Sequence, residues 1–384
     1  MKKYIPILLS ISVCSLFGSQ EYVKVENLTN EYIDKKYEID KKIILNNNIK
    51  SKWDIISPIN LSYSKNLEHE EEYSSISFSQ DIFRSGGIFH SVKYSNILED
   101  IDLKSLDIEQ KNILLNIHML LKSYQLLEIN IEDIKLTLSN KKIELKTKEE
   151  QFKNGLIDIF TVNDLLITIE TLNNSLIDLE IEKKLLLKDL KKYTKYNFKE
   201  IKLTHLPFPE KKVFLKENII NLDSIKIESL KKYKDLKVSE YLPKISIFAS
   251  STKYNEPTKE KYDSYGIRAS LKIHPNVYFN NEKSRLDILK SKVTYEEKKY
   301  QMSNLYEFNK SKYDLITKKE INFNEIIKMF EMKIEALKKD VDLGNIAKYN
   351  VKILINSKKQ YELKKLKLKL TKDLMVISLR KNMF

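Results

Sequence analysis

The sequence predicts an elongated, mainly α-helical protein with a small β part, in which a unit of two strands and a long helical hairpin occurs twice. The first observation is that only Gly155 interrupts residues 88–206 and only Gly344 interrupts residues 276–384. Residues that break helices are therefore missing where Leu, Ile, Lys and Glu are dense. The second observation is that four short segments outside these stretches alternate apolar and polar residues, which is typical of strands with two different faces.

Residues 1–19 have the layout of a secretory signal peptide, because two lysines precede an apolar stretch that ends in small and polar residues. That stretch is too short for a stable membrane anchor, and the alternative is a buried first helix. Cys14 is the only cysteine and lies in this segment. Cleavage would leave no thiol for a disulfide or a metal site. Lipid modification of Cys14 is the alternative, although Val13 is bulky where lipoprotein signals place a small residue.

The first repeat covers residues 20–206. It is expected to contain a short helix over about 26–50, strands over about 58–64 and 74–83, and a helical hairpin over 88–193 that turns at Gly155. Leu61 and Tyr63 alternate with Ser62 and Ser64, which indicates a strand with one apolar face. A lone glycine between two helical stretches suits a tight turn, because it tolerates a positive φ.

The second repeat covers residues 207–384 and begins with a linker that contains Pro207 and Pro209. It is expected to contain a short helix over about 216–239, strands over about 243–251 and 264–274, and a helical hairpin over 281–380 that turns at Gly344. Pro58 and Pro243 open the first strand of each repeat. The order of elements therefore indicates an internal duplication.

The long first arm of each hairpin would span roughly 90 to 100 Å at 1.5 Å per residue. Arms of this length must pack against neighbours, because an isolated helix gains its stability from a buried apolar face. One arm has apolar residues at spacings of three and four, which predicts a coiled-coil seam. The seam residues are Ile113, Ile117, Leu120, Tyr124, Leu127, Ile131, Ile134 and Leu138.

Four strands cannot close into a barrel within one chain. An open sheet would leave unpaired backbone groups in a bilayer, so a membrane-spanning sheet must be a closed barrel of at least about eight strands. Several copies would then share one barrel: two copies give eight strands with a packed interior, and three give twelve strands with a lumen. The polar faces, with Arg268 and Lys272, would line that lumen.

Composition gives little support for other classes of function. The formal net charge is +14, but only four residues are arginine and the lysines alternate with glutamates, so no nucleic-acid partner is expected. The five histidines are far apart in the sequence, and metal-ligand spacings, phosphate-binding glycine loops and nucleophile motifs are missing. Neither an enzyme nor a cofactor is expected.

Three motifs connect this pattern to a known family. They are QDIFRSGG over residues 80–87, FKNGLIDI over 152–159 and VDLGNIAKYN over 341–350. With the duplicated order and the prolines before the strands, the chain resembles the TolC-like outer membrane efflux proteins, also called outer membrane factors. The resemblance implies a homotrimer, with a twelve-stranded β-barrel in outer membrane lipid that continues as an α-helical coiled-coil tunnel through the periplasm.

The family resemblance also implies a role and partners. It implies a passive conduit in tripartite efflux or type I secretion, working with a periplasmic adaptor (membrane fusion) protein and an inner-membrane pump of the RND or ABC type. The transported substrate is selected by the pump, so the sequence does not identify it. The alternative is a secreted or periplasmic elongated coiled-coil protein, structural or tethering, without a pore.

Site residues carried over from the family lie at the two hairpin turns. Adaptor-docking tips are assigned to Gly155, Leu156, Ile157, Gly344, Asn345 and Ile346. The simpler alternative is that the glycines only close the turns.

The constriction of the tunnel is less typical of the family, which often has aspartates shortly after the second glycine. Here the second turn is followed by Asn350, so Asp164 after the first turn is the better candidate for a carboxylate facing the pore. An aspartate early in a helix also suits the helix dipole.

Overall fold

The computed structural model describes residues 29–66, 71–196, 207–216, 219–255, 260–342 and 348–382. The predicted signal peptide, residues 1–19, lies outside the described residues. The second predicted tip, with Gly344, Asn345 and Ile346, also lies outside them.

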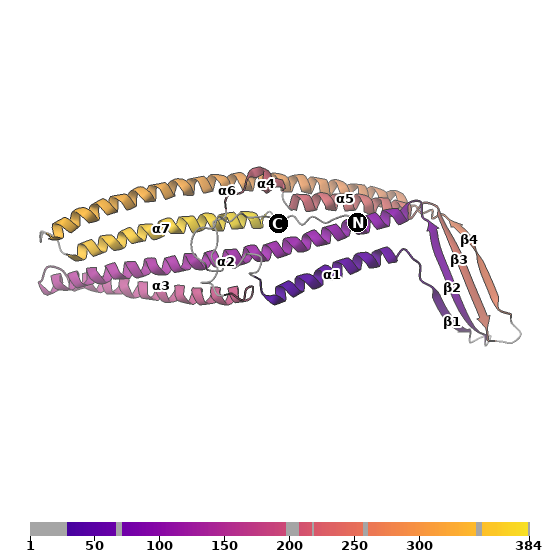
Figure 1. Cartoon of the computed structure of the whole chain (residues 1–384), viewed down its shortest axis with the longest axis horizontal. Helices are drawn as coiled ribbons and strands as arrows, with labels where there is room; N and C mark the ends of the chain where they lie inside the picture. The colour runs from indigo at the N-terminus through magenta and orange to yellow at the C-terminus, as the bar shows by residue number, and fades with distance from the viewer. Residues whose placement is uncertain are drawn as a thin grey trace, which may run out of the picture.

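Two long helices set the length of the molecule, and a four-stranded sheet lies at one end of it (Figure 1). The helices α2 (Gly87–Lys153) and α6 (Asn276–Asp342) have 67 residues each. At 1.5 Å per residue, each spans about 100 Å. Shorter helices run alongside these two helices over most of their length (Figure 1).

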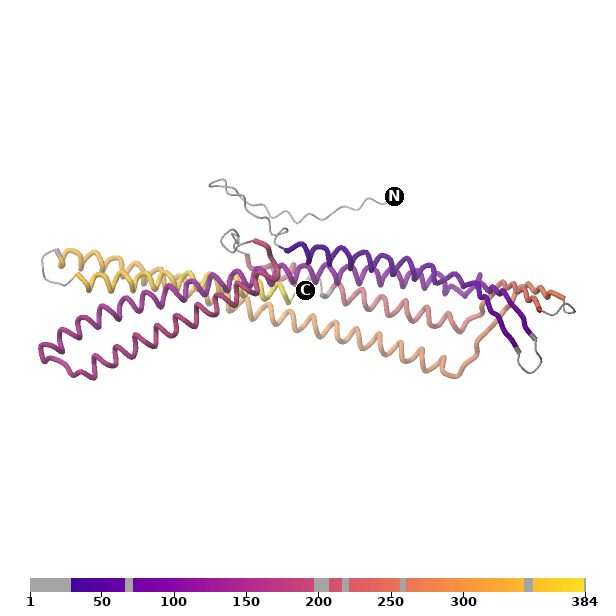
Figure 2. Tube along the Cα trace, turned by 90° about the horizontal axis from the view of Figure 1, so that it is seen from below, coloured from indigo at the N-terminus to yellow at the C-terminus, as the bar shows by residue number. Residues whose placement is uncertain are grey.

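The shorter helices are distributed in the same way in both repeats. Next to the sheet lie α1 (Glu31–Trp53) and α5 (Ile219–Ser239), and in the far half lie α3 (Ile159–Lys191) and α7 (Lys348–Lys381). The helices α1 and α3 pack on α2, whereas α5 and α7 each contact both α2 and α6. Both helical hairpins end opposite the sheet (Figure 2).

The sheet joins the two repeats. Its strands are β1 (Asn60–Asn66), β2 (Glu71–Phe83), β3 (Lys244–Tyr254) and β4 (Tyr262–Ser270), in the order β1-β2-β3-β4 with antiparallel pairing throughout. The central pair, β2 with β3, therefore crosses from one repeat to the other. The sheet is open, with β1 and β4 at its edges, so the barrel that the sequence predicts is not formed by one chain.

The predicted strand over 264–274 differs from β4 at both ends. β4 begins earlier, at Tyr262, and it ends at Ser270, although the alternation of the sequence continues beyond this residue. Ser270 pairs with Lys244, the first residue of β3. The preceding residue, Pro243, has no N–H group to donate, so the ladder has no partner for a longer β4. Lys272 consequently lies outside the strand.

The apolar core follows the long helices. Five of the eight predicted seam residues are buried, namely Ile117, Tyr124, Leu127, Ile131 and Leu138. Leu121 and Ile129, which the seam did not include, are buried as well. The buried stripe is wider than a two-helix seam because α2 packs against four helices rather than one.

The middle of the bundle has a second core, where the linker between the repeats crosses it. Phe214 in the short helix α4 (Lys211–Lys216) is fully buried against Tyr306 and Leu379. The Tyr306 hydroxyl donates a hydrogen bond to the carbonyl of Pro209 at 3.0 Å. The linker is therefore held against α6 by both packing and a hydrogen bond.

Polar contacts fix the register of α7 along α2. The Asn356 amide donates to Asn140 Oδ1 at 2.7 Å, and one turn further the Gln360 amide donates to Thr137 Oγ1 at 2.7 Å. Nearer the middle, Lys122 Nζ lies 2.7 Å from Asp373 Oδ2, with the two side chains only 7% and 5% exposed. Shifting one helix by a turn would leave these buried groups unpaired, so the register is strongly specified.

Replacing Asp373 with alanine should destabilise the protein by about 3 to 5 kcal/mol, because Lys122 would remain buried without its counter-ion. The measurement is the guanidinium denaturation midpoint, followed by circular dichroism. The double variant Lys122→Met, Asp373→Leu should lose less stability than Asp373→Ala, because no unpaired charge stays buried.

The control for this experiment is Asp189→Ala, since Asp189 pairs with Lys192 at the exposed surface. Its midpoint should stay close to that of the unchanged protein. Equal losses for Asp373→Ala and Asp189→Ala would contradict the assignment of the buried pair as a helix clamp.

Candidate functional site: a two-faced sheet and a helical tip

One face of the sheet is mainly apolar, and its charged residues, Lys65, Glu72, Lys253 and Asp263, lie towards the loop end. Residues that pair across antiparallel strands have their side chains on the same side, so the register assigns each residue to a face. The apolar face carries Leu61, Tyr63, Ile76, Phe78, Ile245, Ile247, Ala249, Tyr265, Ile267 and Ala269. Leu61, Tyr265 and Ile267 are 75%, 86% and 74% exposed. Such a continuous apolar surface marks contact with another protein or with a membrane.

The opposite face is polar and rich in serine. It carries Ser62, Ser64, Ser75, Ser77, Ser79, Ser246, Ser250, Thr252, Ser264 and Ser270. The hydroxyls of Ser62 and Ser75 lie 2.7 Å apart across β1 and β2. The register also places other residues on this face, namely Asp81, Lys244, Phe248, Arg268, Tyr73, Tyr254 and Tyr262. Small hydroxyl side chains leave room for water above the sheet, so this face suits contact with an aqueous space.

The edges of the sheet are available for pairing. β1 and β4 each have one neighbour in the described chain, so half of their backbone N–H and C=O groups point away from the sheet. Exposed edges of this kind are templates for pairing with a further strand. The sheet is therefore incomplete on both sides and on its apolar face.

The first residues of the QDIFRSGG motif hold the sheet to the helices. Gln80 Oε1 accepts a hydrogen bond from the backbone N–H of Ser57 at 2.7 Å, and its Nε2 donates to the carbonyl of Ile55 at 3.1 Å. Arg84 pairs with Asp81 at the end of β2. Gln80 thereby fixes the connection between α1 and β1, where the chain turns from bundle to sheet.

The turn between α2 and α3 forms the described tip of the bundle. Gly155 has a φ of 71°, and no atom lies within 4 Å of the position that a Cβ would take. The strain of an L residue at this φ, rather than lack of space, selects glycine here. Asp158 caps α3 by accepting a hydrogen bond from the backbone N–H of Phe160 at 3.0 Å.

Apolar side chains surround this turn. Leu156 is 71% exposed and Phe160 is 70% exposed, whereas Ile157 is half-buried. Sequence reasoning assigned Leu156 and Ile157 to the tip but missed Phe160. The available signal was a large apolar residue in the first turn after the N-cap Asp158. The tip is thus an exposed apolar surface on a closed turn.

The two candidates for a constriction lie on different helices. Asp164 is exposed on α3, and Asn350 is exposed near the start of α7. The backbone carbonyl of Asp164 accepts a hydrogen bond from Thr168 Oγ1 at 2.8 Å. No hydrogen bond joins the side chains of Asp164 and Asn350, both of which the structure describes. A single chain does not bring these residues together.

Charged groups inside the bundle act as clamps between helices. Besides the Lys122 and Asp373 pair, Lys372 Nζ lies 2.7 Å from Glu320 Oε2 and connects α7 to α6. His118, one turn from Lys122, has a pKa lowered to about 4 by burial, and then by the charges of Lys122 and Arg380. His118 is therefore neutral at pH 7.

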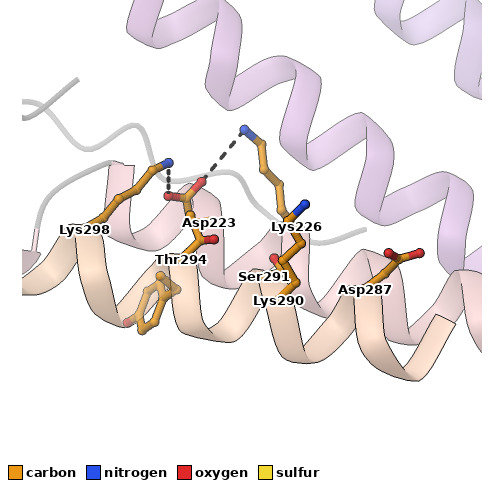
Figure 3. Close-up of a pocket in the computed structure, with 8 residues that line it drawn as sticks. Asp223, Lys226, Asp287, Lys290, Ser291, Thr294 and Lys298 are labelled. Atoms are coloured by element: carbon orange, nitrogen blue, oxygen red, sulfur yellow. Dashed lines mark hydrogen bonds and ion pairs between the residues drawn. The ribbon is translucent and has the colours of Figure 1, made fainter. Parts of the chain in front are cut away.

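A shallow cavity of about 240 Å³ lies between α5 and α6 (Figure 3). Asp223 lies 2.7 Å from Lys298 and 3.9 Å from Lys226, so its carboxylate connects the two helices. Asp287 and Lys290 line the same cavity. The arrangement is an ion-pair clasp open to solvent. Across the described part of the chain, no group of three or more His, Cys, Asp and Glu residues is placed to hold a metal ion.

Among the helices that the structure describes, none has an apolar stretch of the length needed to cross a membrane.

No family model and no curated protein sequence matches the chain. Solved structures do match its fold. The Campylobacter jejuni CmeC outer membrane channel has a TM-score of 0.66 and 12% identity, covering 96% of this chain and 90% of that chain. The Vibrio cholerae outer membrane protein VceC has a TM-score of 0.66 and 12% identity, covering 92% of each chain.

A membrane protein from Pseudomonas aeruginosa also matches, with a TM-score of 0.69 and 10% identity over 94% of this chain and 88% of that chain. At these identities the similarity concerns the fold. The chain therefore has the fold of TolC-like outer membrane channels, which confirms the resemblance drawn from its motifs at the level of architecture.

Lowering the pH from 7.5 to 5.0 should reduce the free energy of unfolding by about 2 kcal/mol through His118. The unfolded histidine titrates near 6.5 and the folded one near 4, so between these values only the unfolded state takes up the proton. The contribution of neutral His118 to stability is therefore fully present above pH 6.5 and is lost as the pH falls towards 4. The check is guanidinium denaturation at both pH values.

The comparison variant for this experiment is His118→Gln, which has no titrating group at this position. Between pH 7.5 and 5.0 the free energy of unfolding of this variant should fall by about 2 kcal/mol less than that of the unchanged protein. An identical loss in both proteins would show that His118 does not carry the pH dependence.

Proposed function

We propose that this chain is one subunit of a homotrimeric outer membrane channel that carries substrate through the periplasm and the outer membrane as a passive conduit. The observation that supports it most directly is that the two long helices have unequal neighbours: α2 contacts helices of both repeats, whereas α6 contacts mainly helices of its own repeat. The fold comparisons give independent support, because the matching structures include the CmeC outer membrane channel and the outer membrane protein VceC.

The helices show which contacts are missing. The helix α2 packs against α1 and α3 of its own repeat and against α5 and α7 of the next repeat. Its counterpart α6 packs against α5 and α7 of its own repeat, and in the described chain it has no comparable packing against α1 or α3. If the two repeats are equivalent, the missing partners of α6 are α1 and α3 of another copy.

Exposed apolar side chains support such an interface between copies. On the half of α6 next to the sheet, residues spaced by seven form an exposed stripe: Phe279, Leu286, Val293 and Tyr300. The helix α1 exposes Ile39 and Ile43, and α3 exposes Ile177 and Ile181. A seven-residue apolar repeat is the pattern of a helix that packs along another helix. The apolar stripe of α6 could therefore pack against the exposed apolar residues of α1 and α3 in another copy.

The sheet also lacks neighbours that another copy would supply. Because β2 pairs with β3 across the repeats, β4 of one copy would pair with β1 of the next. Three copies would then close a twelve-stranded barrel. Two copies would give eight strands, whose interior must be filled by side chains, but the inward face here is mainly serine. A serine-rich face favours the larger barrel with a water-filled lumen.

The dimensions and surfaces of this barrel fit a bilayer. The four strands have 7, 13, 11 and 9 residues, an average of 10, which matches the roughly 9 to 11 residues that a tilted transmembrane strand needs. The apolar face would contact outer membrane lipid, and the roughly 100 Å helices would extend into the periplasm. Arg268 would face the lumen, and Lys272 would lie at its periplasmic rim.

The tips are proposed as the docking surface for a periplasmic adaptor protein, which connects to an inner-membrane pump of the RND or ABC type. The first tip contributes Gly155, Leu156 and Ile157, together with the exposed Phe160. The second tip is proposed at Gly344, Asn345 and Ile346 by equivalence of the repeats. Asp164 and Asn350 are proposed near the periplasmic constriction. This role needs no cofactor and no catalytic group.

The pore-free alternative, an elongated tethering protein, accounts for the long helices. It gives no reason for a sheet with one apolar and one hydroxyl-rich face and two open edges.

Replacing Val293 with aspartate should abolish the trimer, because a charge would enter the stripe of α6 that faces the next copy. In the single chain Val293 is exposed, so the fold of the monomer should be retained. The readouts are the trimer band of outer membrane fractions on unheated gels and the helical circular dichroism signal.

The matched control is Lys292→Asp, an exposed neighbour about 100° away around the helix. It should leave the trimer intact. A soluble, elongated protein in the periplasmic fraction, unaffected by Val293→Asp, would contradict the channel and favour the tethering protein.

Replacing Leu156 with glutamate should weaken the binding of the purified trimer to its periplasmic adaptor by about tenfold or more, because an exposed apolar contact would be lost. The affinity would be measured by surface plasmon resonance with purified periplasmic adaptor proteins of the same organism. Lys188→Glu, on the exposed side of α3 away from the tip, should bind normally. Equal affinities for Leu156→Glu and the unchanged trimer would contradict docking at this tip.

A further inference from the structure

Arg268 is an exposed cation on the polar face of the edge strand β4, near the end of the sheet that joins the helices. No carboxylate contacts its guanidinium among the described residues. Instead, its Cζ lies 4.9 Å from the centre of the Phe248 ring. Cations elsewhere in the chain commonly have acidic partners, as Lys122 has Asp373 and Lys183 has Glu128. Arg268 therefore contributes a charge that no local group neutralises.

The position of the guanidinium is fixed from below. Phe248 pairs directly with Gly266 across β3 and β4. A Cβ at Gly266 would lie only 3.1 Å from two carbon atoms of the Phe248 ring, so the ring occupies the space above the glycine backbone. Arg268, the diagonal neighbour, then lies over this ring and is held by a cation–π contact. The charge is thus ordered rather than free to fold away.

Neighbouring charges on the same face increase the positive potential. The register places Asp81, Ser246 and Arg268 in one row across the sheet. The Asp81 carboxylate is already engaged by Arg84, which cancels its charge. Lys244, in the next row opposite Ser270, has no acidic partner in the described chain. Two cations per chain are left without local compensation near the end of the sheet that joins the helices.

We propose that Arg268, held on Phe248 and assisted by Lys244, forms an anion-selective filter in the lumen of the channel. The inference rests on the proposed function, since in a closed trimer these groups recur three times at one height around the pore. Charged rings in a narrow pore with low-dielectric walls concentrate ions of opposite sign. The substrate class favoured by this filter is anionic, such as molecules that carry carboxylate, sulfate or phosphate groups.

The test uses a single cysteine as a probe of the local potential. Ser270→Cys introduces a thiol on the same face, exposed and two residues from Arg268. Cys14 is the only native cysteine, and it is replaced by serine so that the probe is unique. The rates of modification by an anionic and a cationic methanethiosulfonate reagent are then compared in purified trimers.

With Arg268 present, the anionic reagent should react faster than the cationic one. In Arg268→Gln the ratio of the two rates should fall by about threefold or more, as expected for removing unit charges some 7 Å from the probe in water at physiological salt. Arg268→Lys keeps the charge and should keep most of the preference. Arg285→Gln, an exposed arginine on α6 paired with Glu282, should leave the ratio unchanged.

A second readout is the reversal potential of trimers in planar bilayers under a gradient of potassium chloride. It should indicate preference for chloride, and Arg268→Gln should shift it towards potassium. An unchanged rate ratio in Arg268→Gln would overturn the filter while leaving the channel standing. A thiol at position 270 that reacts with neither reagent, in a protein that conducts no ions, would instead overturn the proposed channel.

Discussion

The structure depends on one constraint: four strands and their apolar face cannot be satisfied within a single chain. The edges at β1 and β4 leave backbone groups unpaired, and Leu61, Tyr265 and Ile267 expose large apolar surfaces. Neither condition is stable in water or in lipid for an isolated sheet. In the proposed trimer, pairing with further copies would remove the open edges, and outer membrane lipid would cover the apolar face. The open faces of α1, α3 and α6 would also gain partners, so the sheet and the helices favour the same assembly.

Long helices can serve such an assembly only if they keep their register. A helix of 67 residues has many alternative positions against an apolar neighbour, because leucine and isoleucine stripes repeat every turn. The polar contacts between α2 and α7, from Asn356 with Asn140 to Asp373 with Lys122, distinguish one position from the others. Buried polar groups weaken the core slightly but penalise every shifted arrangement. They fix the position of α7 along α2, while the unbroken helix α2 itself sets the distance between the sheet and the tip at Gly155.

The two ends of the molecule differ in the chemistry of their surfaces. The tip offers exposed apolar side chains on a closed turn, which suits protein contact. The sheet offers a hydroxyl-rich face with few charges, so each charge on it would have a long reach in the proposed lumen. Arg268 on Phe248 is an example: in that channel its effect would follow from the absence of a nearby carboxylate as much as from its own position.

The sequence by itself determined the classes of element and their duplication. Two local patterns can be read without knowing any tertiary contact. One is the scarcity of glycine and proline in the helical stretches, and the other is the alternation around Leu61 and Ile267. The tertiary structure decided what depends on neighbours: β4 ends at Ser270 because Pro243 cannot continue the ladder, and Leu121 is buried because α2 packs against four helices. The contact of Arg268 with Phe248 joins two strands through a glycine in register, and no local pattern encodes a register between strands.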